Sequence, residues 1–569
     1  MPTAIPGQTA ASAFPEAPCT LLSTCKRALT PHGLCVFVLF LFSFPGLYWM
    51  YPTITDRLES YQPLQALKFF ATLGQAFHKY GPFPNFVLAP YYGVTLAVWH
   101  FMGTLKPPYS TYPFGFANPL AQMNLLIIEG RSAFMVLCLW SAYLLVKRMA
   151  RLSGSWLLIT AVCVALIASN YNYNAILSST RPDALMMAFG TFFMAVYLDA
   201  TMDGLTLRRG VLLGLCAVSA VSAKELIYAM FVLPVLFLIV RAALGKDPTL
   251  RPGKPLLRWM LTTGLVTFGA YALVNIVYAP HTWIARIRYW SSGEGLDTSI
   301  WGSYSAATNL RNGLLCALDN LGVGGALLVV AAMVMLLVRR PRYSLALSTP
   351  ALSFVLFAIA QIHYTEIRYF MPLSIALPPL VLVGLEELRS HLEKSWKQAA
   401  FRIALTFCLI ANLVWGSYSW YFLSSLREVV IRKHILSSPQ DQTFYIYSTY
   451  KLYPGSNILP NYGYRLEDKA FQEILDSNGP WPDVIYITTG TEGFIRDAVN
   501  NSAKFPGRAD FIERLGFNPT RWTGFEQLGY CRAAVIPPWT PSWFPYKWMY
   551  GVREQERIES VEVYSRHCP

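Results

Sequence analysis

The sequence predicts a polytopic α-helical membrane protein of about eleven transmembrane helices, with the amino terminus inside, the carboxyl terminus outside and a carboxyl-terminal α/β domain. Three observations support this fold class. Hydrophobic residues make up 54% of the 569 residues and charged residues only 14%, a composition unlike that of a soluble domain. Apolar runs of about 20 residues recur along the chain. After residue 423 the composition changes to turns and short β-type runs.

Basic loops and acid-containing loops alternate between the apolar runs. Clusters such as Lys147-Arg148 and the stretch from Arg241 to Arg258 occupy every second connection. The positive-inside rule places these basic loops in the cytoplasm and the intervening loops outside. It also explains the net charge of +14 without nucleic acid, because the Lys and Arg residues lie in short juxtamembrane clusters.

The transmembrane module is predicted over residues 31–423. Residues 1–30 are rich in Ala, Pro, Ser and Thr and predict a disordered cytoplasmic extension. No small-x-small cleavage site follows the first span, which therefore reads as an uncleaved signal anchor. The predicted spans are 33–51, 121–146, 155–172, 183–200, 209–223, 226–243, 256–278, 314–338, 345–363, 368–386 and 401–423.

The first outer loop, 52–119, is predicted to contain two interfacial elements. Polar residues recur every three or four positions over 63–79, which predicts an amphipathic helix on the membrane surface. Residues 83–102 are apolar enough to compete as a twelfth span. Counting them would place the basic cluster at 147–151 outside, so a re-entrant or interfacial segment is favoured.

The carboxyl-terminal region, 424–569, predicts a small extracytoplasmic α/β domain. Two β-type runs, 443–447 and 484–488, flank a helical stretch at 466–475, and a further helix is expected at 492–500.

The ten cysteines show no CxxC pair and no metal-ligand spacing. Only Cys531 and Cys568 lie in the polar tail, where they can form a disulfide if the tail faces an oxidising compartment. The second long outer loop, 279–312, is rich in Trp, Tyr, Ser and Gly and predicts a lid over a substrate.

Polar residues from several outer loops gather on one predicted membrane face. Asp56 follows the first span closely, with Glu59 about one helical turn later. A carboxylate at headgroup depth is well placed to act as a general base, although a lone outer acid is more often a solvated charge. Arg181 and Asp183 flank Pro182 at the start of a span, where helix capping is the competing explanation.

Cations complete this face. The pair Lys224-Glu225 is open to two interpretations, a salt bridge between helices or contact with a phosphate. Arg286 lies in the second long outer loop. The turn IHYTEIRYFMPL brings His363, Arg368 and Tyr369 to the same side, where a cation would neutralise a phosphate and a ring would stack on a sugar or anchor at the interface.

Carboxylates, several cations and an amphipathic helix at headgroup level predict the transfer of a sugar from a lipid phosphate. A carboxylate takes the proton from an acceptor hydroxyl as it attacks the anomeric carbon, and cations hold the departing phosphate. Direct displacement inverts the anomeric centre. Metal dependence stays open, because outer acids can bind a divalent cation without any diagnostic spacing.

Two other functions compete with this hypothesis. A transporter or flippase of a lipid-linked substrate would use the outer charges as half of an alternating-access pathway, but such proteins usually show internal repeats and polar residues near mid-membrane. A non-catalytic scaffold would use its tail to bind a glycan or a partner protein. Loss of activity in Asp56→Asn separates catalysis from both.

Several segments, in order along the chain, resemble the integral-membrane glycosyltransferases of the C-type fold (GT-C). The closest branch contains the protein O-mannosyltransferases and the lipid A aminoarabinose transferases. The resembling pieces are Asp56, the Arg131-containing span that ends in Lys147-Arg148, STRPDALMMAF from Ser179, GVLLGLCAVSAVSAKE ending at Glu225, and RYFMPLSIALPP from Arg368.

The resemblance implies a polyprenyl-phosphate sugar donor and an acceptor that is a glycan, a lipid or a protein. It implies that Asp56 is the catalytic base, that Asp183 is a second outer acid, and that Lys224 and Arg368 contact the donor phosphate. The chain departs from the commonest family pattern in having Asp56-x-x-Glu59 instead of adjacent Asp-Glu. The family branch also implies a bacterial inner membrane with the active site facing the periplasm.

Overall fold

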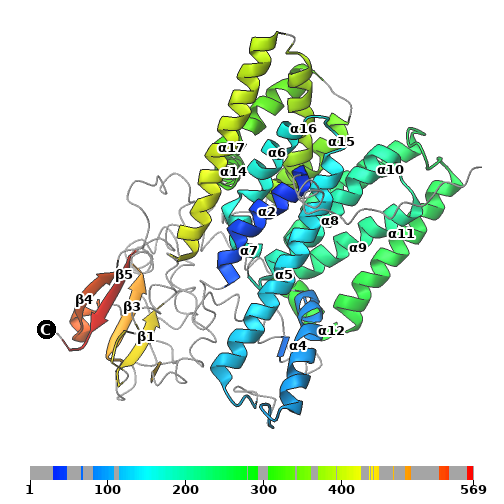
Figure 1. The fold of residues 1–569 in the computed structure, drawn as a ribbon. Helices are drawn as coiled ribbons and strands as arrows, with labels where there is room; N and C mark the ends of the chain where they lie inside the picture. Colours follow the sequence, from blue (N-terminus) through cyan, green and yellow to red (C-terminus); the bar gives the residue numbers. More distant parts are fainter. Residues whose placement is uncertain are drawn as a thin grey trace, which may run out of the picture.

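A computed structural model shows a large helical part followed by a smaller part that contains a β-sheet (Figure 1). Among the predicted segments, the extension at 1–30 and the helices at 466–475 and 492–500 lie largely or wholly outside the described residues. The structure describes residues 30–47, 66–67, 81–107, 115–177, 179–278, 280–291, 306–339, 343–359, 370–392, 394–424, 435, 437–439, 441–447, 465–466, 481–488, 524–536 and 560–567.

Every predicted span overlaps a helix. The number of crossings and their sidedness stay predictions, because the helices themselves do not locate a bilayer. The helices are α2 (Pro31–Ser43) with η1 (Phe44–Leu47), α5 (Pro119–Met149), α6 (Trp156–Cys163) with η2 (Val164–Ala168), α7 (Tyr171–Leu177), α8 (Pro182–Asp203), α9 (Leu207–Ala223), η3 (Glu225–Ile227) with α10 (Tyr228–Ala243), α11 (Lys254–Ala272) with η4 (Leu273–Val277), α12 (Pro280–Ser291), α14 (Ala306–Val338), α15 (Ser344–Phe354) with η5 (Val355–Ile359), α16 (Pro372–Ser390) and α17 (Ser395–Ser424).

Within the described ranges, six helices are long and apolar enough to cross a membrane by length and composition. The apolar segments Pro31–Leu47, Trp156–Ala168 and Ser344–Phe357 are shorter. The six are Ala121–Met149, Pro182–Asp203, Glu225–Ala243, Lys254–Val277, Asn320–Val338 and Ser395–Ser417.

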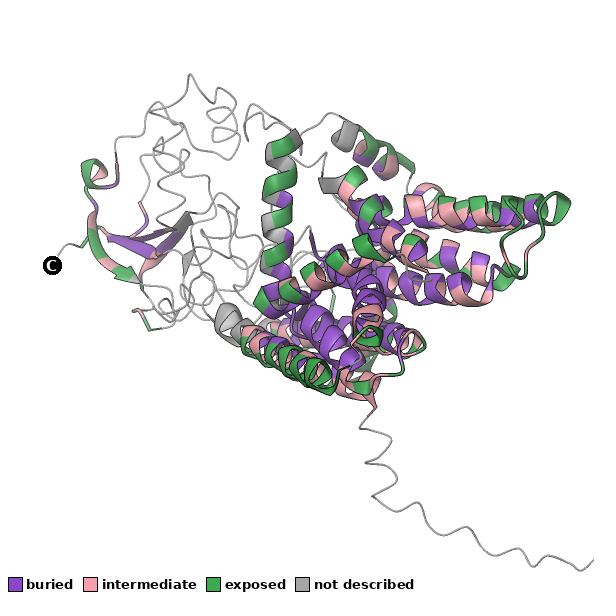
Figure 2. Cartoon of the chain, turned by 90° about the horizontal axis from the view of Figure 1, so that it is seen from above, coloured by how far each residue is buried: buried purple, intermediate pink, exposed green. Residues whose placement is uncertain are grey.

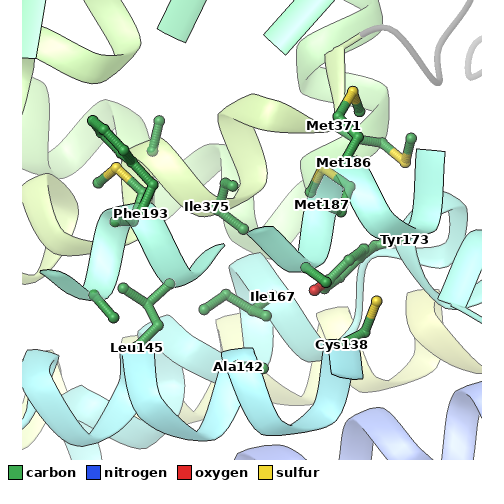
Figure 3. Close-up of a cluster of buried hydrophobic side chains, with 14 of the residues drawn as sticks. Cys138, Ala142, Leu145, Ile167, Tyr173, Met186, Met187, Phe193, Met371 and Ile375 are labelled. Carbon is green, nitrogen blue, oxygen red and sulfur yellow. The ribbon is translucent and has the colours of Figure 1, made fainter. Parts of the chain in front are cut away.

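Helix α8 forms the centre of the helical part. In its most apolar stretch 72% of the residues are buried, against 6% for α11. The buried side chains around α8 are large and apolar, and Met187 and Phe193 lie among residues of α5, η2 and α16 (Figure 3). The contrast between a buried centre and exposed outer helices is visible in Figure 2. A helix that is apolar on all sides is expected either in such a core or against lipid.

The basic cluster at 147–151 pairs with acids from the end of α8. Arg148 Nε lies 3.2 Å from Asp199 Oδ2, and Arg151 lies 3.1 Å from Asp199 and 2.6 Å from Asp203. Arg209, at the start of α9, lies 3.0 Å from Asp203. Loops predicted to be cytoplasmic therefore meet at one end of the helices, as the alternation of charge requires.

Helix α4 (Phe83–Phe101) corresponds to the competing twelfth segment. It is a continuous helix with Pro90 inside it, and it is not among the six helices apolar enough to cross a membrane. Its beginning contacts the end of α9, because a Cβ atom on Gly81 would lie 1.8 Å from the Ser222 carbonyl oxygen. Of the predicted amphipathic helix at 63–79, only Ala66 and Leu67 are described, and both are helical and buried.

The carboxyl-terminal part contains a five-stranded mixed sheet with strand order β2-β1-β3-β5-β4. The two predicted strands are confirmed as β1 (Thr443–Tyr447) and β3 (Val484–Thr488), which are parallel, with Phe444 opposite Val484. Parallel neighbours need a crossover connection, which agrees with the predicted β-α-β order. The other strands are β2 (Arg465–Leu466), β4 (Cys531–Ile536) and β5 (Val561–Ser565).

Cys531 is disulfide-bonded, whereas Cys35, Cys138, Cys163, Cys216 and Cys408 are free. Its predicted partner, Cys568, lies outside the described residues. Because disulfides persist in oxidising compartments, the bond is consistent with a tail outside the cytoplasm.

Candidate functional site

Asp183 and Lys224 form a buried ion pair between α8 and α9. Lys224 Nζ donates to Asp183 Oδ1 at 2.5 Å, and the two side chains are 6% and 5% exposed. Asp183 lies in the first turn of α8 and Lys224 is the C-cap residue of α9. Because the chain reverses direction between these helices, the start of α8 and the end of α9 meet at the same end of the helical part.

Arg286 brings a second ion pair to this end. Its Nε lies 3.3 Å from Glu225 Oε1, and the Arg286 side chain is 4% exposed. Arg286 comes from α12, inside the loop that the sequence predicts to be a lid, so this loop contacts the residue that follows Lys224. The two acids and two cations therefore pair across different elements, and the predicted Lys224-Glu225 pair belongs to a larger cluster.

Asn275 and Ser222 hold Arg286 in place. Arg286 NH2 donates to Asn275 Oδ1 at 2.9 Å, and Asn275 Nδ2 donates to Ser222 Oγ at 2.7 Å. Ser222 lies two residues before Lys224, so this chain of hydrogen bonds connects α12, η4 and the end of α9. Buried polar groups satisfied in this way fix side-chain positions.

Arg181, two residues before Asp183 in the sequence, is also buried. It is 6% exposed and is the N-cap residue of α8 with an extended backbone, as expected for a residue that precedes a proline at the helix start. No side-chain cap is formed at this position, and Asp183 is paired with Lys224. Capping alone therefore does not account for the Arg181-Pro182-Asp183 motif.

Arg131 and Glu129, which lie two residues apart on α5, take different partners. Arg131 is completely buried, and its NH1 donates to the carbonyl oxygens of Gly46 at 3.1 Å and Leu47 at 3.3 Å. Glu129 accepts a hydrogen bond from Thr95 Oγ1 on α4 at 2.8 Å. Arg131 thus binds the chain at the point where it leaves the first span for the loop that contains Asp56.

The structure brings together Asp183, Lys224 and Arg286 of the predicted site residues, with Arg181 adjacent in sequence and Glu225 as a further member. These five residues are called the polar cluster below. Five predicted residues lie outside the described residues: Asp56, Glu59, His363, Arg368 and Tyr369.

Sequence reasoning missed Asn275, Ser222 and the close approach of Gly81. Asn275 lies within an apolar run, where a polar side chain is a signal of a functional or structural contact. Ser222 and Gly81 carry no such signal, because small residues are common in membrane helices for packing.

The polar cluster contains three cations, Arg181, Lys224 and Arg286, and two carboxylates, Asp183 and Glu225. Buried charges of this kind need partners, and a phosphate gaining negative charge would be stabilised by preorganised cations. Among the described residues, no three His, Cys, Asp or Glu side chains gather in a way that could hold a metal ion.

No family model matches the chain, and no curated protein matches it by sequence. Several solved structures are similar to it. ArnT from Cupriavidus metallidurans bound to undecaprenyl phosphate is 13% identical, with 95% of this chain and 98% of that chain covered and a TM-score of 0.46.

Two further similar structures are of the Archaeoglobus fulgidus oligosaccharyltransferase. Its apo form is 11% identical with a TM-score of 0.47, and covers 85% of this chain and 72% of that one. Its complex with Zn and sulfate is 10% identical with a TM-score of 0.40, and covers 90% of this chain and 72% of that one. At such low TM-scores these likenesses carry no weight in the functional argument. Both proteins are GT-C-fold glycosyltransferases, the class that the sequence resembles.

Proposed function

We propose that the chain is a membrane glycosyltransferase that moves a sugar from a polyprenyl-phosphate donor to an extracytoplasmic acceptor. The acceptor class is a glycan, a lipid or a protein. The transferred unit is a hexose or a pentose. The proposal places the enzyme in the inner membrane of a bacterium with its site facing the periplasm.

The observation that carries the proposal is the buried polar cluster at the ends of α8 and α9. Membrane proteins rarely bury Arg, Lys, Asp and Glu unless the charges serve a function. Here the ion pairs Lys224–Asp183 and Arg286–Glu225 lie at the end of the helices opposite the basic loops. An anionic lipid headgroup is the ligand that such a cluster fits, because its phosphate can take the place of a carboxylate beside Lys224 or Arg286.

In the proposed reaction, an acceptor hydroxyl oxygen attacks the anomeric carbon of the donor. The bond between that carbon and the phosphate oxygen breaks, and polyprenyl phosphate leaves with the bonding electrons. The hydroxyl proton passes to a carboxylate base, for which Asp56 is proposed, with Glu59 and Asp183 as further acids. Lys224, Arg286, Arg181, His363 and Arg368 are proposed to stabilise the departing phosphate, and Tyr369 to contact the sugar.

The products would be a glycosylated acceptor with inverted anomeric configuration and a free polyprenyl phosphate. The atoms and charges of the proposed step balance as written. Binding of a divalent cation by Asp56 and Glu59 is a separate question that chelation of the purified protein would answer.

The experiment that tests the proposal measures consumption of a panel of polyprenyl-phosphate sugars. Purified wild-type protein and the Asp56→Asn variant are incubated with each donor and a crude envelope acceptor. We expect one donor to be consumed by the wild type, and the variant to be slower by at least about a hundredfold, as is usual for loss of a general base.

A matched control is Asp441→Asn, which removes an exposed carboxylate from the tail and should leave turnover unchanged. Equal rates for wild type and Asp56→Asn would refute the assignment of the base. Absence of turnover of every donor would contradict the transferase proposal.

A further inference from the structure

We propose that one exposed face of α11 binds an anionic phospholipid of the bilayer. Lys254 and Arg258 would hold the phosphate-containing headgroup, and Leu261, Leu265 and Phe268 would contact an acyl chain. These five residues are called the α11 strip. This site is separate from the polar cluster, and it does not depend on the proposed transferase activity.

The α11 strip is a single face of the helix. Its members follow one another at spacings of four, three, four and three residues, a pattern that aligns side chains along one side of an α-helix. All five are exposed, and Leu261, Leu265 and Phe268 have exposed fractions of 57%, 71% and 66%. Cations at the helix start thus continue into apolar side chains on the same face.

The opposite face of α11 packs against α9 and fixes the orientation of the strip. Leu256 and Trp259 are buried, and Trp259 Nε1 donates to the Thr206 carbonyl oxygen at 3.1 Å. A Cβ atom on Gly210 would lie 2.5 Å from the Trp259 ring, so α9 and α11 approach closely there. The strip therefore points away from the protein.

The described acids at this end already have cationic partners. Asp199 and Asp203 pair with Arg148, Arg151 and Arg209, and Asp247 pairs with Arg241. Among the described residues, neither Lys254 nor Arg258 forms a salt bridge. Two cations without an acidic partner at the end of a membrane-spanning helix attract anionic headgroups.

The dimensions also fit a lipid. From Arg258 to Phe268 the helix rises about 15 Å at 1.5 Å per residue, which is half of a hydrocarbon core about 30 Å thick. A headgroup at Arg258 therefore leaves one leaflet's depth of apolar surface for its acyl chain. The large side chains of the strip differ from the small residues that membrane helices usually place at helix interfaces.

The test is native mass spectrometry of the full-length protein with added phosphatidylglycerol or phosphatidylcholine. We expect the wild type to retain phosphatidylglycerol in preference to phosphatidylcholine. The double variant K254Q/R258Q should bind phosphatidylglycerol about tenfold or more weakly, as expected from losing two headgroup contacts. Both positions are exposed, so the variant should keep the thermal stability of the wild type.

The matched control is K397Q/R402Q on α17, which also removes two exposed cations next to exposed apolar residues. Lys397 and Arg402 are five residues apart and so lie on different faces of that helix. We expect this control to retain the lipid preference. Equal binding of both lipids by the wild type, unchanged binding by K254Q/R258Q, or equal losses in the two variants would each overturn the proposal.

Discussion

The Asp183–Lys224 pair is closer than the Arg286–Glu225 pair, at 2.5 Å against 3.3 Å. Removing one partner from a buried ion pair leaves an uncompensated charge and typically costs about 3–5 kcal/mol. We expect Asp183→Asn and Lys224→Gln each to lower the thermal unfolding temperature of the purified protein and to reduce donor turnover. The double variant Asp183→Asn/Lys224→Gln should be less destabilised than the sum of the single variants, because it leaves no lone charge.

Thermal unfolding of the four proteins tests this pairing as a double-mutant cycle. Additive losses would mean that Asp183 and Lys224 act independently, which contradicts their 2.5 Å contact.

Asp247 is a charged residue with a structural role, because its hydrogen bonds fix the loop between α10 and α11. Burial alone would raise the pKa of Asp247, but hydrogen bonds from Arg241 and the backbone amides of Leu250, Thr249 and Leu205 lower it to about 2. Since the pKa of Asp247 is lowered on folding, the ionised carboxylate stabilises the folded state above the unfolded pKa of about 3.9. That contribution, about 2 kcal/mol, is lost as the pH falls through about 2.

Asp247→Asn should therefore destabilise the protein at pH 7, and the difference from wild type should shrink between about pH 4 and pH 2. Thermal unfolding at a series of pH values measures this difference. A difference that stays constant down to pH 2 would show that the ionised carboxylate is not the source of the stability.

The sequence indicated which charged residues belong to the candidate site. It did not indicate which residues they pair with. Asp183, Lys224 and Arg286 could be singled out because the positive-inside rule does not explain charged residues in the loops predicted to face outward. Their partners come from different helices, and the spacing along one chain carries no information on such contacts. Lys224 therefore pairs with Asp183, 41 residues away, rather than with its neighbour Glu225.

At the scale of elements, the apolar runs predicted the helices well, because a membrane span is recorded in the length and composition of one continuous segment. Interruptions within helices were less visible. Helix α14 has a non-helical residue, Gly322, with φ of 67°. Asn412 of α17 donates to the carbonyl oxygen of Leu321 at 2.8 Å and accepts from the amide of Gly325 at 3.1 Å. These contacts satisfy backbone groups near the break, as the interior of a membrane protein requires.

The contact between Gly81 and α9 connects the first outer loop to the polar cluster. A methyl group on Gly81 would collide with the Ser222 carbonyl oxygen, and Ser222 holds Asn275, which in turn holds Arg286. We expect Gly81→Ala to destabilise the protein by about 1–3 kcal/mol and to reduce donor turnover, as measured by thermal unfolding and the donor assay.

Gly264→Ala is the control for this change, because nothing lies within 4 Å of a Cβ atom at Gly264. If Gly81→Ala behaved like Gly264→Ala, the proposed docking of the first outer loop on α9 would be wrong.

At the scale of the whole molecule, the alternation of basic and acidic loops makes a prediction about sidedness. The exposed Asp441 lies in the tail and the exposed Lys246 lies between α10 and α11. A membrane-impermeant maleimide added to intact cells should label Asp441→Cys, whereas Lys246→Cys should be labelled only after permeabilisation. The parent protein reports the background from its own cysteines, and the reverse labelling pattern would invert the predicted topology.

The carboxyl-terminal part shows which features of a fold a local sequence pattern can predict. The strands β1 and β3 were predicted to the residue because alternating, β-branched and aromatic runs bounded by turns are a local signal. Their assembly with β5 and β4 into one mixed sheet depends on pairings over long separations in the chain, which no local pattern encodes.

A transferase breaks the bond between the sugar and the lipid phosphate, whereas a transporter moves the intact lipid. The measurement that tests the proposed transferase activity most directly follows a polyprenyl-phosphate sugar in sealed proteoliposomes containing wild-type protein and an envelope acceptor. We expect release of free polyprenyl phosphate and a glycosylated acceptor. Recovery of the intact donor in the opposite leaflet, with no free polyprenyl phosphate, would contradict the proposed transferase activity and identify a transporter.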